Sequence, residues 1–299
     1  MALVDRSATI RHMRRHYRTN LFLPLVVILL LALTAPCSAA LYTFSKVGDG
    51  TYAAIAQPGS KAASNALIII GRYQVILAGS HFVAEGVAEL TREIAQLTPL
   101  PIRTVILTHH HKGYSFVDFD FPATIEMIMS WQTWQAMKSE RRDLKNNVTF
   151  FKTDLTLVRD NTTIVLTNTE QGHSNGDTIL FIPTSGLLFA SDLVFNDQIG
   201  FMGDAAMRDW VLNLEMLEEL GATMVIPGLG SPGPSQIITR FKEFFRDFLT
   251  EVIRLKNANR TLTQAKKEFS LPARYQKLPG YPNMVSTNLE RAYNDQSIH

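Results

Sequence analysis

Apolar residues along this chain form short continuous runs and amphipathic stretches, and the two kinds alternate. The first continuous runs lie at 41–44, 51–55 and 66–77, and Gly and Asn residues bound them. Runs of this length are typical of strands that are buried on both faces. At 83–96 the apolar positions recur every three or four residues, as on one face of a helix. A short apolar run at 104–107 follows, so this part predicts a strand–helix–strand unit.

The same alternation continues through the rest of the chain. The expected strands or strand pairs are 122–129, 153–167, 178–190 and 224–226, and the expected helices are 130–142, 207–220 and 234–256. Each half of the chain is thus rich in strands first and helical afterwards. Because each layer must bury its apolar face against another, we predict an α/β fold: an αββα four-layer sandwich with a C-terminal helical extension.

Residues 1–40 have the pattern of a leader. Five arginines lie between positions 6 and 18, and the thirteen residues 21–33 carry no charge. Small residues follow and end at Ser38-Ala39-Ala40. A basic, an apolar and a small-residue segment in this order are typical of a cleaved signal peptide. A membrane anchor is the alternative, but the apolar stretch is short for the ~20 residues of a span and Pro24 interrupts it. We therefore predict a signal peptide and a periplasmic mature protein.

Removing this leader changes the charge balance. The whole chain has a formal net charge of +2, and without five basic residues and one acidic residue it keeps 24 basic and 26 acidic residues, a net charge of −2. The composition therefore implies no nucleic-acid partner and no stable membrane insertion after leader removal. The single cysteine, Cys37, also leaves, and Pro36 before it does not suit a lipoprotein site. Without disulfides, the mature chain must be stabilised by a core.

Six histidines remain beyond the leader, and three of them are consecutive. His109, His110 and His111 follow the predicted strand 104–107. Residues i and i+2 of an extended segment point to one side, so His109 and His111 can converge while His110 faces away. His173 is a third candidate, and three imidazoles plus a water form a catalytic zinc site. The alternative is a surface histidine run and an unrelated His173.

Four segments resemble motifs of the metallo-β-lactamase superfamily, in the same order and at compatible spacing. They are Thr108-His109-His110-His111, Gly172-His173-Ser174-Asn175-Gly176, Leu188-Phe189-Ala190-Ser191-Asp192 and Pro227-Gly228-Leu229-Gly230. The family counterparts are His-x-His-x-Asp-His, Gly-His-Thr-x-Gly, Leu-Phe-x-Gly-Asp and Pro-Gly-His-Gly. The combination is more specific than any one segment. The resemblance implies a metallo-β-lactamase-fold domain at 41–232, with a helical extension at 233–299 packed on the same domain.

The resemblance also implies a ligand set for one zinc ion. His109, His111 and His173 match the three histidines of the family's first zinc site, and Asp192 matches the aspartate that bridges two metals in glyoxalase II-type hydrolases. Zinc in such a site lowers the pKa of its water toward ~7 and polarises a carbonyl. Asp192 would complete the coordination or orient that water. Tyr114 is a candidate donor to a developing oxyanion, although loop tyrosines more often pack.

Departures from the family pattern concentrate on the second metal. Gly113 and Tyr114 stand where the first motif has aspartate and histidine, and Leu229 replaces the histidine of Pro-Gly-His-Gly. Ala78 occupies a position where the family often has an aspartate. The second site would keep Asp192 at most, which is too few ligands for zinc. We therefore expect one zinc ion, and a two-metal mechanism is not expected.

Two functions remain open on the sequence. The first is a mono-zinc hydrolase that cleaves a small-molecule ester, thioester, lactone or amide through zinc-bound hydroxide. The second is a non-catalytic metal- or ligand-binding descendant of the fold. The first is favoured because loss of function would not obviously spare all three histidines. The missing carboxylate at Gly113 is the main objection, and Asp118 or Asp120 could replace it. The sequence neither supports nor excludes a β-lactam substrate and does not fix the oligomeric state.

Overall fold

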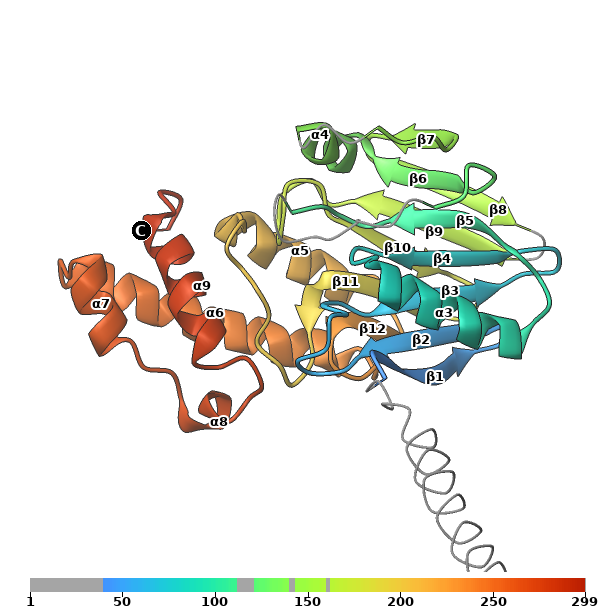
Figure 1. Cartoon of the computed structure of the whole chain (residues 1–299). Helices are drawn as coiled ribbons and strands as arrows, with labels where there is room; N and C mark the ends of the chain where they lie inside the picture. The colour runs from blue at the N-terminus through green and yellow to red at the C-terminus, as the bar shows by residue number, and fades with distance from the viewer. Residues whose placement is uncertain (1–39, 112–120, 140–142, 160–161, 299) are drawn as a thin grey trace, which may run out of the picture. The chain divides into compact units, whose positions relative to one another are not determined.

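The apolar runs form two β-sheets that pack face to face (Figure 1). The computed structural model describes residues 40–298 apart from 112–120, 140–142 and 160–161. The first sheet has the order β1-β2-β3-β4-β5-β6-β7. Its strands are β1 (Tyr42–Gly48), β2 (Thr51–Ala56), β3 (Ala66–Ile70), β4 (Val75–Gly79), β5 (Ile102–Leu107), β6 (Glu126–Ser130) and β7 (Val148–Phe151). Pairing is antiparallel from β1 to β4 and parallel from β4 to β7.

The second sheet has the order β12-β11-β10-β9-β8. Its strands are β8 (Asp154–Arg159), β9 (Thr162–Asn168), β10 (Thr178–Ile182), β11 (Leu187–Phe195) and β12 (Met224–Leu229). Only β11 and β12 pair in parallel among these strands. The crossover between them passes through a helix on the outer face, as parallel pairing requires.

Helices cover the outer faces of both sheets (Figure 1). The described helices are α3 (Ala84–Leu97), α4 (Trp131–Ser139), α5 (Met207–Glu219), α6 (Gln236–Asn257), α7 (Leu262–Glu268), α8 (Ala273–Gln276) and α9 (Asn283–Asn294), and the last three lie beyond the sheets. Val87, Leu90 and Ile94 of α3 pack on the first sheet. The helices α5 and α6 pack on the second sheet, and α9 packs on α6.

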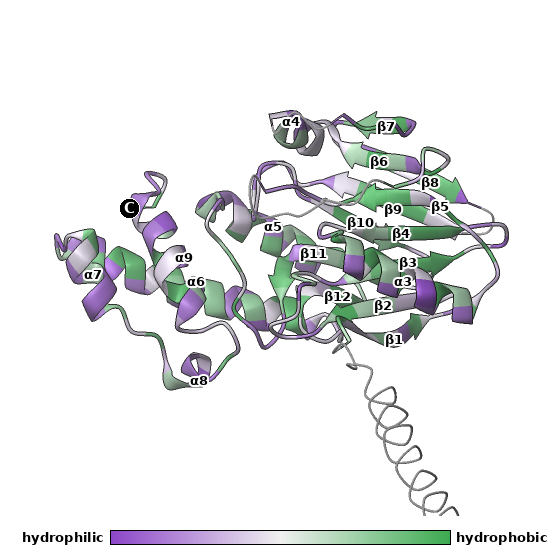
Figure 2. Cartoon of the chain, viewed as in Figure 1, coloured by the Kyte–Doolittle hydropathy of each residue, from purple (hydrophilic) through white to green (hydrophobic). Residues whose placement is uncertain are grey.

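Alternate side chains of the buried strands enter different cores. In β3, Ile68 packs under α3, whereas Leu67 and Ile69 pack between the sheets. Apolar residues on both faces of these strands explain the continuous runs, because each face is covered by another layer. Figure 2 shows the same pattern, with hydrophobic strands inside and hydrophilic positions on loops and outer helix faces. The predicted αββα sandwich with a C-terminal helical extension is confirmed.

Two local expectations differ from the structure. A single strand at 66–77 is wrong, because β3 and β4 form an antiparallel hairpin whose turn is closed by Gly71 N–H donating to Gln74 O at 2.9 Å. The strand β7 was not expected, since its four residues carry no long apolar run. The helix expected at 234–256 is α6, and its phenylalanines, Phe241 and Phe245 among them, lie in the core.

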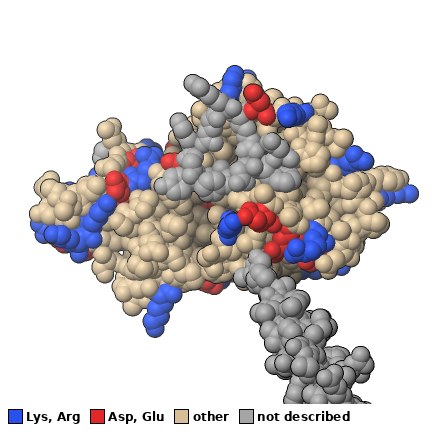
Figure 3. Space-filling view, in the orientation of Figure 1, with Lys and Arg blue, Asp and Glu red and all other residues tan. Residues whose placement is uncertain are grey.

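Within the described part of the chain, no helix is long and apolar enough to cross a membrane. On the face shown in Figure 3, basic and acidic side chains lie in small separate groups with uncharged surface between them. This face therefore presents no continuous basic area.

Candidate metal centre

The two sheets bring distant parts of the sequence together at one edge. The strand β5 ends at Leu107, and its continuation reaches the second sheet, where Thr178 N–H donates to Thr108 O at 2.8 Å. The Thr108 and Ser191 hydroxyls lie 2.9 Å apart. Ser191 precedes Asp192 on β11, so the histidine segment lies directly beside this aspartate.

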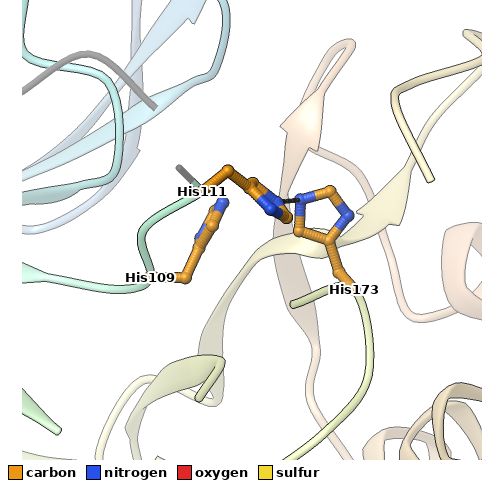
Figure 4. A group of neighbouring side chains, drawn as sticks. All are labelled: His109, His111 and His173. Atoms are coloured by element: carbon orange, nitrogen blue, oxygen red, sulfur yellow. Dashed lines mark hydrogen bonds between the residues drawn. The ribbon is translucent and has the colours of Figure 1, made fainter. Parts of the chain in front are cut away.

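His109, His111 and His173 meet at this edge (Figure 4). Each offers one ring nitrogen, and the three nitrogens lie within 4.8 Å of one another. All three side chains are buried. Nε2 of His111 lies 2.6 Å from Nε2 of His173, and the ring of His109 stands 4.9 Å from that of His173. His110 is buried as well but lies outside this group, as expected from the alternation of side chains.

The loop before β10 is folded so that His173 points to this group. Asp177 accepts hydrogen bonds from the Ser174 N–H at 3.0 Å and from the Ser174 hydroxyl. Gly172 is required at its position, since a Cβ there would lie 2.7 Å from Asn213 Nδ2 and 2.8 Å from Leu193. Packing therefore explains the glycine before His173, and the hydrogen bonds to Asp177 explain the serine after it.

Asp192 lies beside the histidines and is held from the opposite side. Its Oδ2 lies 3.7 Å from His109 Nε2 and 3.6 Å from His173 Nε2. Its Oδ1 accepts a hydrogen bond from the Ser64 hydroxyl at 2.5 Å. Burial raises the pKa of this carboxyl to about 6. Gly228 allows this approach, because a Cβ there would lie 2.1 Å from Asp192 Oδ1.

Buried nitrogens in this group fit a bound cation. Among the described residues, His109 Nε2 is buried and has no hydrogen-bond partner, so its lone pair is open to a cation. Burial, and then the neighbouring histidines, lower the pKa values of His109 and His173 well below their usual range. Neutral imidazoles are the form that a metal binds, and three of them are a common zinc donor set. The three histidines therefore form a potential metal-binding group.

Asp204 is a further residue of this site that the sequence did not indicate. Its Oδ2 lies 2.7 Å from Nδ1 of His111, on the side of the ring opposite to Nε2. This hydrogen bond is the main cause that lowers the pKa of the Asp204 carboxyl. A carboxylate in this position fixes the tautomer and the orientation of a ligating imidazole. Asp204 lies in the loop between β11 and α5, where a lone aspartate has no distinguishing local pattern.

The helix α9 holds the loop that carries Asp204. Asn288 is fully buried, accepts a hydrogen bond from Met202 N–H at 2.8 Å and donates one to Gly200 O at 2.9 Å. Arg291 of the same helix donates to Ala205 O at 2.7 Å. Hydrogen bonds therefore connect α9 directly to the loop that contains Asp204, beside the candidate metal centre.

Comparison with solved structures gives the same architecture. A metallo-β-lactamase from Pontibacter korlensis matches with a TM-score of 0.61 at 19% sequence identity, over 69% of this chain and 99% of that chain. This protein has the metallo-β-lactamase fold. The DIM-1 metallo-β-lactamase (TM-score 0.59, 18% identity) and TMB-1 (TM-score 0.59, 16% identity) each match over 69% of this chain and 98% of their own. No family model and no curated protein matches the sequence, and at these identities the likeness shows the fold alone.

Of the four residues that depart from the family pattern around a second metal, the structure describes two, Ala78 and Leu229. Gly113 and Tyr114 lie outside the described residues. Ala78 is fully buried in β4 among apolar side chains between the sheets. Leu229, at the end of β12, lines the cavity next to the histidines. Among the described residues, the candidate metal-binding group at this edge consists of the three histidines.

A cavity of about 400 Å³ adjoins the metal centre. His111, His173 and Asp192 lie at its wall. The other walls are mostly apolar, and α9 contributes three neighbouring residues to them. The described lining residues are His81, Ala63, Ile199, Gly200, Phe201, Leu229, Asn283, Met284 and Thr287 in addition to those three. No lysine or arginine occurs in this set. Leu271 and Tyr275 of the C-terminal extension lie in the core.

Proposed function

We propose that this protein is an exported hydrolase that uses one zinc ion to cleave an ester, thioester, lactone or amide bond in a small molecule. The observation that carries the proposal is the group of three buried imidazoles beside a buried carboxylate at the wall of a cavity. Pockets of ~300–1,000 Å³ are typical for small ligands, and this cavity is about 400 Å³. The similar solved structures are metallo-β-lactamases, and a hydrolytic reaction agrees with that.

The chemistry follows from the donor set. His109, His111 and His173 would hold the zinc ion, which would supply a nucleophilic water near neutral pH and polarise the substrate carbonyl. Asp204 would keep His111 in the tautomer whose Nε2 lone pair is free for the metal, because its carboxylate accepts from Nδ1–H.

Asp192 is the proposed base of the reaction. Ser64 donates to its Oδ1, which leaves Oδ2 directed toward His109 and His173. In this position Oδ2 can accept a proton from the attacking water or hold that water in line with the carbonyl. Tyr114 remains a proposed oxyanion donor and lies outside the described residues.

One zinc ion rather than two is proposed for a physical reason. Leu229 and Ala78 offer no donor atoms, and Asp192 alone would be a single ligand of any second ion. The apolar side chain of Leu229 borders the cavity instead. Leu229, which stands where the family motif has a histidine, thus offers an apolar surface for a substrate in place of a metal ligand.

The test is hydrolysis by purified mature protein of a panel of activated esters, thioesters, lactones and lactams. Chelator should abolish turnover and added zinc should restore it, while the unfolding transition shows that the chain stays folded. His111→Ala should also abolish turnover, because it removes one imidazole of the group. His110→Ala is the matched control, since His110 is adjacent in the sequence but lies outside the group. A zinc-loaded sample that remains inert across the panel, yet binds metal or ligand, would favour the non-catalytic descendant of the fold.

A further inference from the structure

Glu89 is a buried carboxylate that does not belong to the candidate metal centre. It lies on α3, between Val87 and Leu90, which pack on the first sheet. Only 8% of its surface is exposed. Carboxylates are almost never buried to this degree unless they are paired, because their charge loses hydration.

The partners of Glu89 are the first backbone nitrogens of the folded domain. Oε1 lies 2.9 Å from Tyr42 N, and the nitrogen of Leu41 lies 3.1 Å from Oε1 and 3.0 Å from Oε2. Both oxygens thus converge on the single nitrogen of Leu41. A peptide N–H must share its one hydrogen between the two oxygens in a three-centre bond, whereas an ammonium group, with three hydrogens, could give each oxygen its own.

The position of Leu41 is fixed independently of Glu89. Its carbonyl oxygen accepts hydrogen bonds from Gln57 N–H at 2.9 Å and from the Ser60 hydroxyl at 3.2 Å. The following residue, Tyr42, is buried and pairs with Ala56 in the sheet. The nitrogen of Leu41 is therefore held against Glu89 by the edge of the sheet.

No cationic side chain pairs with Glu89 among the described residues: its hydrogen bonds go to the two backbone nitrogens. Several described lysines and arginines pair with other carboxylates; Lys61, for example, pairs with Glu85, which lies on the same helix as Glu89. A buried ion without a counter-ion is strongly unfavourable. The geometry leaves a place for one positive charge at the Leu41 nitrogen.

We infer that the mature chain begins at Leu41 and that its terminal ammonium group forms a buried ion pair with Glu89. The leader sequence points to the same bond, because its small residues end at Ala40. A leader peptidase would add water across the Ala40–Leu41 bond. The C–N bond breaks, Ala40 keeps the new carboxylate, and the amine of Leu41 takes up a proton. The inference concerns processing and stands apart from the proposed hydrolase reaction.

The test compares two forms of the protein, one beginning at Leu41 and one beginning at Ala40. The pKa of the terminal amine should be at least one unit higher in the Leu41 form, a tenfold change, measured by NMR of the ¹⁵N-labelled amine. Glu89→Gln in the Leu41 form should remove this difference. Glu93→Gln is the matched control, since Glu93 lies one turn further along α3 and faces Arg92 on the surface. It should leave the amine pKa unchanged.

Two results would overturn the inference. One is equal amine pKa values in the Leu41 and Ala40 forms, a comparison that needs no change to Glu89 and holds even where Glu89→Gln fails to fold. The other is an N-terminus of exported protein, read by mass spectrometry, at a residue other than Leu41. A start at Leu41 together with the raised pKa supports it.

Discussion

The carboxylate of Asp204 lies 2.7 Å from Nδ1 of His111, while Nε2 of the same ring faces His173 at 2.6 Å. The His111 imidazole therefore lies between the Asp204 carboxylate and another imidazole of the potential metal-binding group. Ligating histidines are commonly fixed in this way, and the anion raises the basicity of the ligating nitrogen. This relationship leads to a direct test.

Asp204→Asn should weaken zinc binding by about 10–100-fold, the usual effect of removing such a partner. The amide cannot accept the Nδ1 proton with the strength of a carboxylate, so the tautomer is less well fixed. Competition with a chromophoric chelator measures the affinity. Asp209→Asn is the control, because Asp209 is exposed at the start of α5. Equal zinc affinity in wild type and D204N would contradict the role assigned to Asp204.

Metal content should approach one zinc ion per chain. The double variant His109→Ala with His111→Ala should lose it, because two of the three imidazoles of the group are removed. Elemental analysis after dialysis against metal-free buffer measures the ratio. Two ions retained per chain would mean that residues outside the group complete a second site.

Asp192→Asn should reduce turnover far more than it reduces zinc affinity. An amide cannot take up the proton of the attacking water, and such general-base contributions are about 10²–10⁴-fold. Ser64→Ala should produce a smaller loss, since it removes only the hydrogen bond to Oδ1. Steady-state kinetics with parallel zinc titrations separate the two effects. If D192N lost zinc affinity and turnover in equal proportion, Asp192 would be a ligand instead.

The metal-free protein should lose stability as the pH falls below 6.5. Burial lowers the pKa values of His109 and His173 below that ordinary value, so the unfolded chain takes up more protons there. Asp192 acts in the opposite direction between pH 3.8 and about 6, because its folded pKa is raised and the folded state keeps the proton. Asp192→Asn removes this compensation and should steepen the loss.

Urea unfolding of the metal-free protein across this pH range gives the free energy of unfolding directly. Replacing His173 by Gln removes one of the two depressed groups and should flatten the decline. A free energy of unfolding that stays constant from pH 7 to pH 5 in the wild type would be inconsistent with two buried neutral histidines.

Thr287→Lys should change substrate preference toward anionic acyl groups. Thr287 lines the cavity, whose described residues include no lysine or arginine. A cation there should improve kcat/KM for a carboxylate-ended acyl ester relative to a neutral one by roughly tenfold, which corresponds to ~1.4 kcal/mol. Ser286→Lys adds the same charge at an exposed neighbour that does not line the cavity. Equal shifts in both variants would show a general charge effect only.

The sequence predicted the layers of the fold because burial dictates them. Strands covered on both faces need continuous apolar runs, and α3 and α6 need apolar stripes, so these elements are visible locally. The hairpin at β3 and β4 was missed because a four-residue turn interrupts one apolar run. The resemblance to family motifs supplied the histidines, which the structure brings together.

Residues with distant partners could not be predicted in the same way. Ser64 meets Asp192 across 128 positions, and Asp204 meets His111 across 93. Glu89 contacts Leu41 across 48. Each is a single polar residue whose role depends on where the fold places its partner. No periodicity or local motif distinguishes such a residue from an ordinary surface one.

The buried amide of Asn288 makes the end of the chain sensitive to events at His111. Its two hydrogen bonds join α9 to the segment that continues into Asp204. A change in the mobility of that segment should therefore change the mobility of α9. Zinc binding that restricts Asp204 should then slow amide hydrogen exchange in α9, although no residue of that helix is a proposed ligand. A disturbance near residue 288 should likewise increase the rate at which zinc dissociates, with all three imidazoles intact.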